Sequence, residues 1–265
     1  MNPVITSSDL RRLEEARTRG KDELDVSLDL GKSKIVVKIV PDGFMVDNQV
    51  IAAVKVRSDE KSCFVLVDGK LEKLQIFSPE TNKLYKLIPT SNKPLLQVSG
   101  TSMHKREFVD RVAQEKLHGR VLDAGTGLGY TALVAAKTAD EVVTVEVDPN
   151  VLTLAEYNPW SVGLFDNPKI KIYEGDVIEE VKDFSDASFD AAVLDGGTPH
   201  ASGMFFSSEL YQEVFRVLKK KSRVLHYLPR VHKTKGRDFP GEVIDRMLAA
   251  GFSLVEQDKD GCFVV

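Results

Sequence analysis

The residues best suited to chemistry lie in a glycine-rich segment that joins a short apolar run to an amphipathic stretch. The segment reads Asp123-Ala124-Gly125-Thr126-Gly127-Leu128-Gly129-Tyr130-Thr131. Glycines let a backbone turn tightly and approach a ligand closely, because they have no β-carbon. A loop of this kind between a strand and a helix is typical of nucleotide-binding sites, although it also occurs as a plain strand–helix turn. The neighbouring side chains therefore decide which ligand it suits.

The spacing of the glycines and the acid in front of them distinguish two kinds of nucleotide. A dinucleotide-binding loop has the pattern G-x-G-x-x-G, and the pyrophosphate rests on the helix that follows. Here the third glycine, Gly129, comes one place early, and Tyr130 takes the position that requires a small residue. The carboxylate of Asp123 would repel a pyrophosphate but attract an ammonium group. The segment therefore favours S-adenosylmethionine, an amino-acid-bearing sulfonium, over NAD.

A second acid follows the next apolar run. Glu146 comes directly after Val142–Val145 and lies 21 positions after Gly125. An acid at the end of a second strand can accept hydrogen bonds from both ribose hydroxyls of a nucleotide. Hydrogen bonds to a charged group contribute about 1.5–3 kcal/mol each. Glu146 and the adjacent Val147 are thus predicted to bind the cofactor, although an exposed carboxylate at a strand end is common by itself.

A third acid, Asp176, follows the third apolar run and stands between Gly175 and Val177. Its carboxylate could accept a hydrogen bond from the exocyclic amine of adenine. It could equally accept a backbone N–H as the N-cap of the following helix. Both interpretations stay open, and one side chain could do both.

An alternating series of strands and helices must bring these residues together. The expected strands are Arg120–Asp123, Glu141–Glu146, Lys169–Glu174, Phe189–Asp195, Arg223–Tyr227, Phe252–Gln257 and Cys262–Val265. The expected helices are Lys105–Lys116, Tyr130–Lys137, Asn150–Tyr157, Val177–Lys182, Ser208–Lys219 and Gly241–Ala250. Such alternation indicates a parallel sheet with helices on both faces. Ligands bind beyond the carboxyl ends of its strands, where the strand order reverses.

The part of the chain before this series has a different pattern. Ser8–Arg19 is predicted to form a helix that Ser7 or Ser8 could cap. Short β-branched runs separated by turn signals then follow, beginning with Val26–Leu30. Asp68-Gly69 is a good hairpin signal. These runs predict a small β domain.

Four segments together resemble the successive motifs of the class I S-adenosylmethionine-dependent methyltransferases. They are VLDAGTGLGYTA, VVTVEVDPN, IKIYEGD and FDAAVLDGG, in the order and at the spacing of that family. The resemblance covers roughly residues 101–265. It implies an α/β fold with a Rossmann-like, seven-stranded, mostly parallel sheet whose last strand is antiparallel. It also implies that Asp123, Gly125 and Gly127 hold the methionine end of the cofactor, Glu146 the ribose, and Asp176 the adenine.

A closer likeness is to a group of predicted archaeal methyltransferases that also carry a β-rich N-terminal region. The phrases Ser99-Gly100-Thr101-Ser102-Met103-His104 and Asn158-Pro159-Trp160-Ser161 resemble this group. The likeness implies that Met103 and His104 line the methionine arm, although His104 could equally be an ordinary residue at a helix start. The complete predicted cofactor site comprises Met103, His104, Asp123, Gly125, Thr126, Gly127, Gly129, Tyr130, Thr131, Glu146, Val147, Gly175, Asp176, Val177 and Asp195.

The loop after the fourth strand departs from the pattern of that group. The group resembles the amino-methyltransferases in having an acid followed by two prolines, whereas this chain reads Asp195-Gly196-Gly197-Thr198-Pro199-His200. Prolines stiffen a loop that can grip a flat amino group, and glycines leave it mobile. The departure argues against methylation of a nucleobase amine. It also keeps a non-catalytic cofactor-binding module as an alternative.

The same loop holds the predicted catalytic residues. Methyl transfer from a sulfonium is an in-line displacement, so an enzyme must mainly align the donor and the acceptor. A base is needed only where the nucleophile carries a proton that leaves early. Asp195, at the end of the fourth strand, is the predicted base, and His200 could assist it. Each has an ordinary alternative, because Asp195 could bond backbone amides and His200 could be solvated.

The methyl acceptor is not identified by the sequence. The stretch that begins at His226 contains Arg230, Lys233, Lys235 and Arg237, which could bind the phosphates of RNA or of an anionic small molecule. These residues could equally form a solvated loop, and a protein acceptor also stays open. The leading alternative activity is that of a polyamine aminopropyltransferase using decarboxylated S-adenosylmethionine, because spermidine synthases have a similar layout. Against it, the glycine loop lacks the acid that follows the glycines in that family.

Length and composition limit the classes of protein to which the chain could belong. The 265 residues suit a β-rich domain over residues 1–95 followed by the methyltransferase domain over residues 96–265. The formal net charge of -4 gives no whole-molecule positive field for nucleic acid. Two distant cysteines, Cys63 and Cys262, indicate neither a disulfide framework nor a metal site. No apolar stretch is long enough to cross a membrane, so we expect a cytoplasmic enzyme without a membrane partner. A homo-oligomer stays open.

Overall fold

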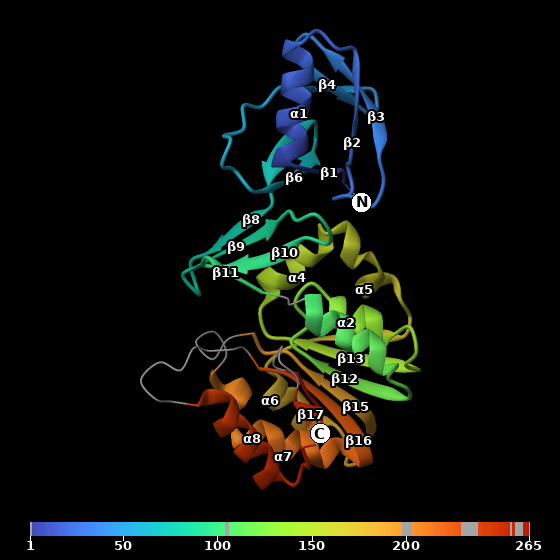
Figure 1. Ribbon diagram of the computed structural model, residues 1–265, viewed down its shortest axis with the longest axis vertical. Coiled ribbons are helices and arrows are strands. Elements are labelled where there is room, and N and C mark those ends of the chain that lie inside the picture. Colours follow the sequence, from blue (N-terminus) through green and yellow to red (C-terminus); the bar gives the residue numbers. More distant parts are fainter. Residues whose placement is uncertain are drawn as a thin grey trace. The chain divides into compact units, whose positions relative to one another are not determined.

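The computed structural model describes residues 2–103, 106–197, 203–228, 238–254, 256–257 and 262–264 (Figure 1). The chain divides into two compact units. The first comprises Met1–Met103 together with Asn150–Val162, and the second comprises His104–Pro149 and Gly163–Val265. Residues 1–95, which the sequence predicts as a separate domain, all lie in the first unit. The segment Asn150–Val162 joins that unit from far along the chain, and no sequence pattern indicated this.

The first unit begins with a short strand and a helix, β1 (Val4–Thr6) and α1 (Ser7–Thr18). The predicted helix is confirmed, but the prediction that Ser7 or Ser8 caps it is wrong. The cap is Thr6, whose Oγ1 accepts a hydrogen bond of 3.0 Å from the Asp9 backbone N–H. Ser7 is buried, and its hydroxyl donates instead to the carbonyl oxygen of Glu60 at 2.9 Å.

Three antiparallel sheets complete the first unit. One has the order β1-β6-β7, with β6 at Cys63–Val67 and β7 at Lys70–Lys73. The second has the order β2-β3-β4-β5, at Glu23–Val26, Ile35–Val40, Gly43–Val46 and Gln49–Ala52. The third has the order β11-β10-β9-β8, at Thr101–Ser102, Leu95–Val98, Lys83–Ile88 and Gln75–Ser78.

Two turns in these sheets test the sequence patterns. The hairpin predicted at Asp68-Gly69 is confirmed, because both residues have positive φ (47° and 75°) and join β6 to β7. The strand predicted at Val26–Leu30 is wrong, because β2 ends at Val26. The hydroxyl of Ser27 accepts hydrogen bonds from the Asp29 and Gly31 amides, which turns the chain there.

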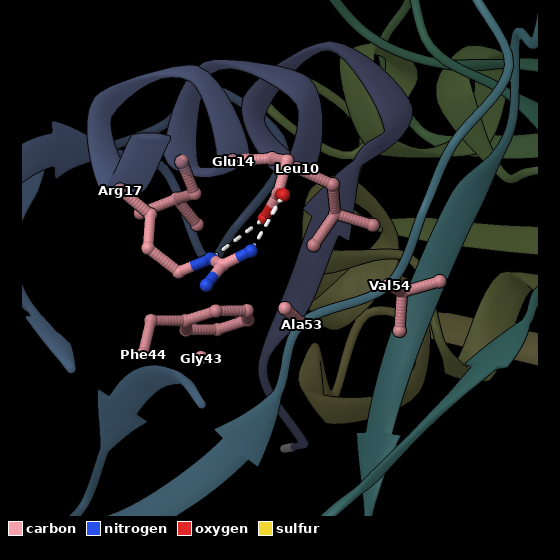
Figure 2. A pocket seen from close by; sticks show the side chains of 8 residues that line it. Leu10, Glu14, Arg17, Gly43, Phe44, Ala53 and Val54 are labelled. Carbon is pink, nitrogen blue, oxygen red and sulfur yellow. Dashed lines mark hydrogen bonds and ion pairs between the residues drawn. The ribbon is translucent and has the colours of Figure 1, made fainter. Parts of the chain in front are cut away.

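Helix α1 packs on the β2–β5 sheet. Its residues Leu10 and Leu13 share a buried core with Phe44 and Ile51. Figure 2 shows the guanidinium of Arg17 beside this core, above the Phe44 ring. Arg17 donates to both carboxylate oxygens of Glu14, at 2.9 and 2.7 Å, and to the carbonyl of Pro41 at 2.7 Å. Arg17 and Glu14, which line a small pocket beside this core, are therefore paired with each other within the fold.

The second unit contains the large sheet, with the strand order β14-β13-β12-β15-β16-β18-β17. These strands are Ile170–Glu174, Glu141–Glu146, Arg120–Ala124, Phe189–Leu194, Leu218–Tyr227, Cys262–Val264 and Glu256–Gln257, in that order. The five strands from β14 to β16 are parallel, and β18 pairs with β16 antiparallel. The predicted α/β fold with a parallel sheet, preceded by antiparallel sheets, is confirmed. Strand order reverses between β12 and β15, so the carboxyl ends of these two strands form the expected ligand position.

Helices cover this sheet. They are α2 (Arg106–Glu115), α3 (Tyr130–Ala135), α5 (Val162–Asp166), α6 (Val177–Glu180), α7 (Ser208–Val217) and α8 (Phe239–Ala250), while α4 (Pro149–Glu156) falls almost entirely in the first unit. Short 3-10 turns lie at Pro159–Ser161, Val181–Asp183 and Gly203–Phe206. The predicted helix Val177–Lys182 is thus only partly α-helical. Helix α7 contacts α6 and α8, and α2 contacts α3. Within the described ranges, no helix is both long and apolar enough to span a membrane.

Candidate cofactor and catalytic site

The glycine loop stands where the strand order reverses. Gly125 follows β12 with a φ of +90°, and a β-carbon there would lie 2.0 Å from the carbonyl oxygen of Asp195. The Asp195 backbone N–H also donates to the Ala124 carbonyl at 2.9 Å. The ends of β12 and β15 can approach this closely only because residue 125 has no side chain. The predicted loop and the predicted base are therefore neighbours.

The next two glycines attach the loop to other elements. Gly127 has a φ of 56°, and its N–H donates to Glu146 Oε2 at 2.8 Å. Gly129 has a φ of 76° and is the N-cap of α3. A β-carbon at Gly129 would meet Leu164 Cδ2 of α5 at 2.7 Å. The loop is thus tied to the end of β13 and covered by α5.

Glu146 is the acid that the loop holds in place. Its side chain is buried, and its second carboxylate oxygen accepts the Asp148 N–H at 3.1 Å. Burial raises the pKa of Glu146, and the N–H groups of Gly127 and Asp148 oppose this increase. Each carboxylate oxygen keeps a further lone pair, so the group could still accept hydrogen bonds from a ribose. Val147, the next residue, is 66% exposed and offers an apolar surface beside it.

Asp123 is fully buried behind the loop. Its Oδ2 accepts a hydrogen bond of 2.7 Å from the Thr144 hydroxyl, while its Oδ1 has no hydrogen-bond partner among the residues that the structure describes. Burial raises the pKa of Asp123 to about 7, although the hydroxyls of Thr144 and Thr131 oppose this increase. The nearby carboxylates of Asp195 and Glu146 add to it. A buried polar atom without a partner is costly unless a ligand, water or ion completes it. This atom therefore fits a site for a cationic ligand.

The third predicted acid, Asp176, caps a helix. Its Oδ1 accepts the N–H of Ile178 at 3.0 Å at the start of α6, which confirms the capping interpretation. Its contact with adenine stays a prediction. The neighbouring Gly175 donates its N–H to the Glu146 carbonyl at 2.9 Å, and Val177 packs into the core.

Three other predicted site residues have side chains that are buried beneath the glycine loop. Thr126, Tyr130 and Thr131 are 1%, 3% and 4% exposed. The hydroxyl of Thr126 lies 2.6 Å from that of Thr144, the residue that bonds Asp123. Their side chains therefore shape the loop, and any contact of theirs with a ligand would come through the backbone.

The loop after β15 explains why glycine follows Asp195. A β-carbon at Gly196 would meet the Phe205 ring at 2.2 Å. Gly197 has a φ of 70° and donates its N–H to Asp195 Oδ1 at 3.4 Å. The expectation that glycine only loosens this loop missed the aromatic ring packed against it, because Phe205 lies nine positions further along the chain.

His226 is a buried residue of this region that sequence reasoning missed. Its Nδ1 lies 3.1 Å from the Leu194 carbonyl, and its Nε2 lies 2.9 Å from the Tyr211 hydroxyl. A carbonyl can only accept, so Nδ1 carries the proton and Nε2 accepts from Tyr211. Burial lowers the pKa of His226 to about 4, so the ring is neutral at pH 7. Its apolar neighbours in β16 were the available signal that it belongs to the core.

Several predicted residues cannot be placed in this site. His104, His200, Arg230, Lys233, Lys235 and Arg237 lie outside the described residues. Met103 lies in the first unit, where its N–H donates to the Leu96 carbonyl at 2.8 Å. Its contact with a cofactor stays a prediction.

Comparisons with known proteins agree with this geometry. The methyltransferase domain family matches residues 122–226, which run from β12 to His226. Over 264 residues, the chain is 33% identical to the uncharacterized protein MJ1233 of Methanocaldococcus jannaschii, covering 92% of this chain and 89% of that protein. The chain belongs to the same family as this Methanocaldococcus jannaschii protein, and residues 122–226 form a methyltransferase domain.

Two further proteins resemble this chain, one in its fold and one in part of its sequence. A solved spermidine synthase in complex with the transition-state analogue AdoDATO has a TM-score of 0.55 at 16% identity, covering 88% of this chain and 73% of that one. This likeness shows the shared fold and the spermidine-synthase-like layout. Protein-L-isoaspartate O-methyltransferase 1 of Syntrophobacter fumaroxidans is 32% identical over 82 residues, which are 31% of this chain and 36% of that protein.

Proposed function

We propose that this methyltransferase transfers a methyl group from S-adenosylmethionine to an acceptor that is RNA, a protein or an anionic small molecule. One observation carries the proposal. At the point of strand reversal, two buried carboxylates, Asp123 and Glu146, flank a glycine loop, and one Asp123 oxygen lacks a partner among the described residues. Such a site suits a cation and opposes a pyrophosphate.

The residues of the site can be assigned to parts of this cofactor. Asp123, with Gly125 and Gly127, would hold the ammonium end. Glu146 would accept the ribose hydroxyls, and the exposed Val147 would cover the adenine together with Asp176. When bound, the cofactor supplies an electrophilic methyl group on a sulfonium.

Asp195 supplies the proton-accepting group. It ends β15, and its backbone is fixed by the hydrogen bond to the Ala124 carbonyl. Its half-buried carboxylate would accept the proton of an acceptor hydroxyl or amine. We expect Asp195→Asn to spare cofactor binding and to lower turnover about 100-fold or more, as loss of a positioned base does. Equal losses of binding and turnover would make Asp195 a cofactor ligand instead.

Two alternatives remain distinct from this proposal. An aminopropyltransferase would use decarboxylated S-adenosylmethionine, and the likeness to spermidine synthase extends to the fold alone. A non-catalytic binding module would keep the cofactor site but transfer nothing. A cytoplasmic location and a homo-oligomeric state are further proposals.

Calorimetric titration with S-adenosylmethionine, its decarboxylated form and NAD tests the reaction class. We expect S-adenosylmethionine to bind at micromolar strength, with the decarboxylated form weaker and NAD not binding. Preference for the decarboxylated form would support the aminopropyltransferase. Binding of NAD, or of none of the three, would refute the proposed function.

A further inference from the structure

Trp160 anchors an inserted segment to the first unit. Its indole Nε1–H donates to the Leu30 carbonyl at 3.0 Å. The ammonium groups of Lys32 and Lys93 lie 5.9 and 5.8 Å from its ring centroid, within the range of cation–π attraction. Lys32 also donates to the Pro159 carbonyl at 2.8 Å. Four contacts therefore hold Pro159 and Trp160 to residues that lie far earlier in the chain.

The local backbone around Trp160 is also fixed. The Asn158 side chain caps the 3-10 turn Pro159–Ser161 by accepting the Trp160 N–H at 3.2 Å. Its amide group donates to the Ser161 hydroxyl at 2.7 Å. Asn158 and Ser161 are both fully buried. The turn is thus a rigid platform for the indole ring.

The two ends of this segment are close in sequence to residues of the candidate cofactor site. Asn150–Val162 belongs to the first unit, yet it begins two positions after Asp148, whose N–H bonds the Glu146 carboxylate. It ends two positions before Leu164, whose side chain packs 2.7 Å from where a β-carbon of Gly129 would lie. Short backbone links therefore join the segment to Asp148, which bonds the ribose-binding acid, and to Leu164, which packs against the glycine loop.

We propose that Trp160 is a positioning residue for the cofactor site, through which the first unit controls cofactor affinity. The inference rests on the proposed function of that site. A segment held at Trp160 keeps Asp148 and Leu164 in place, so less ordering entropy is lost when the cofactor binds. The coupling is reciprocal, because a cofactor that fixes Glu146 and the loop must also restrain Trp160.

Trp160 is the single tryptophan of the chain, so its fluorescence reports on this coupling directly. We expect saturating S-adenosylhomocysteine to reduce acrylamide quenching of Trp160 in the full-length protein. In parallel, calorimetry measures the affinity of the same ligand. Binding by calorimetry with unchanged quenching would overturn the inference while leaving the proposed function intact. Absence of binding would refute the proposed function and this inference with it.

Variants separate positioning from folding. Trp160→Ala should weaken S-adenosylhomocysteine binding at least about fivefold, the lower end of usual coupling between sites. Trp160→Phe keeps a ring beneath the lysines and should restore part of the affinity. The double variant Lys32→Met with Lys93→Met removes the two cations and the Lys32 hydrogen bond to Pro159, keeps the indole, and should weaken binding about twofold to threefold.

A matched control uses Lys34→Met, because Lys34 is an exposed lysine two residues beyond Lys32. We expect it to bind the ligand with wild-type affinity. If the double variant folds and binds as tightly as this control, the inference is wrong, even if Trp160→Ala fails to fold.

Discussion

Strand β13 has a glutamate at each end, and the two carboxylates lie in opposite electrical surroundings. Glu141, at the start, accepts from Arg120 Nε at 2.7 Å and from Lys171 Nζ at 2.8 Å. The Lys171 bond lowers the pKa of Glu141, whereas burial raises the pKa of Glu146 at the end of the strand. The structure records no ion pair for Glu146 among the residues that it describes.

The same contrast holds for the aspartates of the neighbouring strands. Asp190, near the start of β15, accepts from Lys219 at 2.7 Å and from the Arg120 backbone at 2.9 Å, which lowers its pKa. Asp123, at the other edge, is buried and has a raised pKa. Carboxylates that are paired with cations stabilise the fold. Buried carboxylates that lack a cation indicate a site that a cationic ligand completes.

The largest effect that we expect concerns the close approach of Gly125 to the carbonyl oxygen of Asp195. Gly125→Ala should destabilise the protein by about 3 kcal/mol or more, because the new methyl group would collide with the Asp195 carbonyl in a strained backbone. Urea unfolding measures this loss. Gly100→Ala is the matched control, since Gly100 has a similar φ of +87° but nothing within 4 Å. It should cost only about 1–2 kcal/mol. Equal losses would show that β12 and β15 do not approach so closely.

The next effect compares ligand affinity after substitution of the glutamate at each end of β13. Glu146→Ala should weaken S-adenosylhomocysteine binding about 100-fold, since two charge-assisted hydrogen bonds to ribose are lost. Most of the thermal stabilisation by this ligand should disappear. Glu141→Ala, at the other end of the same strand, should leave the affinity unchanged. An unchanged affinity in Glu146→Ala would remove the ribose assignment.

A third effect depends on pH. The pKa of Asp123 is about 7 in the folded protein and near 4 in an unfolded chain. The folded state therefore binds more protons between these values, and the free energy of unfolding should fall as pH rises from about 4 to 7. Asp123→Asn removes this dependence, so it should gain roughly 2 kcal/mol relative to wild type between pH 5 and pH 8.

Urea unfolding at both pH values measures that difference. Saturating S-adenosylmethionine should reduce it, because a cation favours the ionised carboxylate. Parallel pH profiles for wild type and Asp123→Asn without ligand would contradict the assignment of a raised pKa to Asp123.

The smallest effect concerns Glu141, at the edge of the sheet where the carboxylates are paired with cations. Glu141→Ala should cost only about 0.5–1 kcal/mol, because its ion pairs with Arg120 and Lys171 are partly exposed to solvent. The loss should shrink further at high salt. A loss above about 3 kcal/mol that salt does not change would mean that Glu141 is shielded from solvent, as Glu146 is, and would contradict the contrast between the two ends of β13.

The parts of the site that the sequence predicted are those fixed by local chemistry. The glycine loop needs positive φ angles at Gly125, Gly127 and Gly129, and only a few residue types tolerate them. Glu146 follows from its place at the end of an apolar strand. Asp68-Gly69 likewise fixes its own hairpin.

The parts that the sequence missed depend on residues far apart in the chain. Thr6 replaces Ser7 as the helix cap because Ser7 bonds Glu60, 53 residues away. The Phe205 ring leaves no room for a side chain at position 196, and the Leu30 carbonyl accepts the hydrogen bond that holds the Trp160 indole. Periodicity and local motifs report none of these contacts.

A crystal structure with bound S-adenosylhomocysteine tests the central claim most directly. We predict that both ribose hydroxyls lie within hydrogen-bonding distance of the Glu146 carboxylate, with the amino-acid end of the ligand beside Gly125 and Gly127. Density for the ligand elsewhere, or a pyrophosphate from a competing dinucleotide across Gly125–Gly129, would contradict the account.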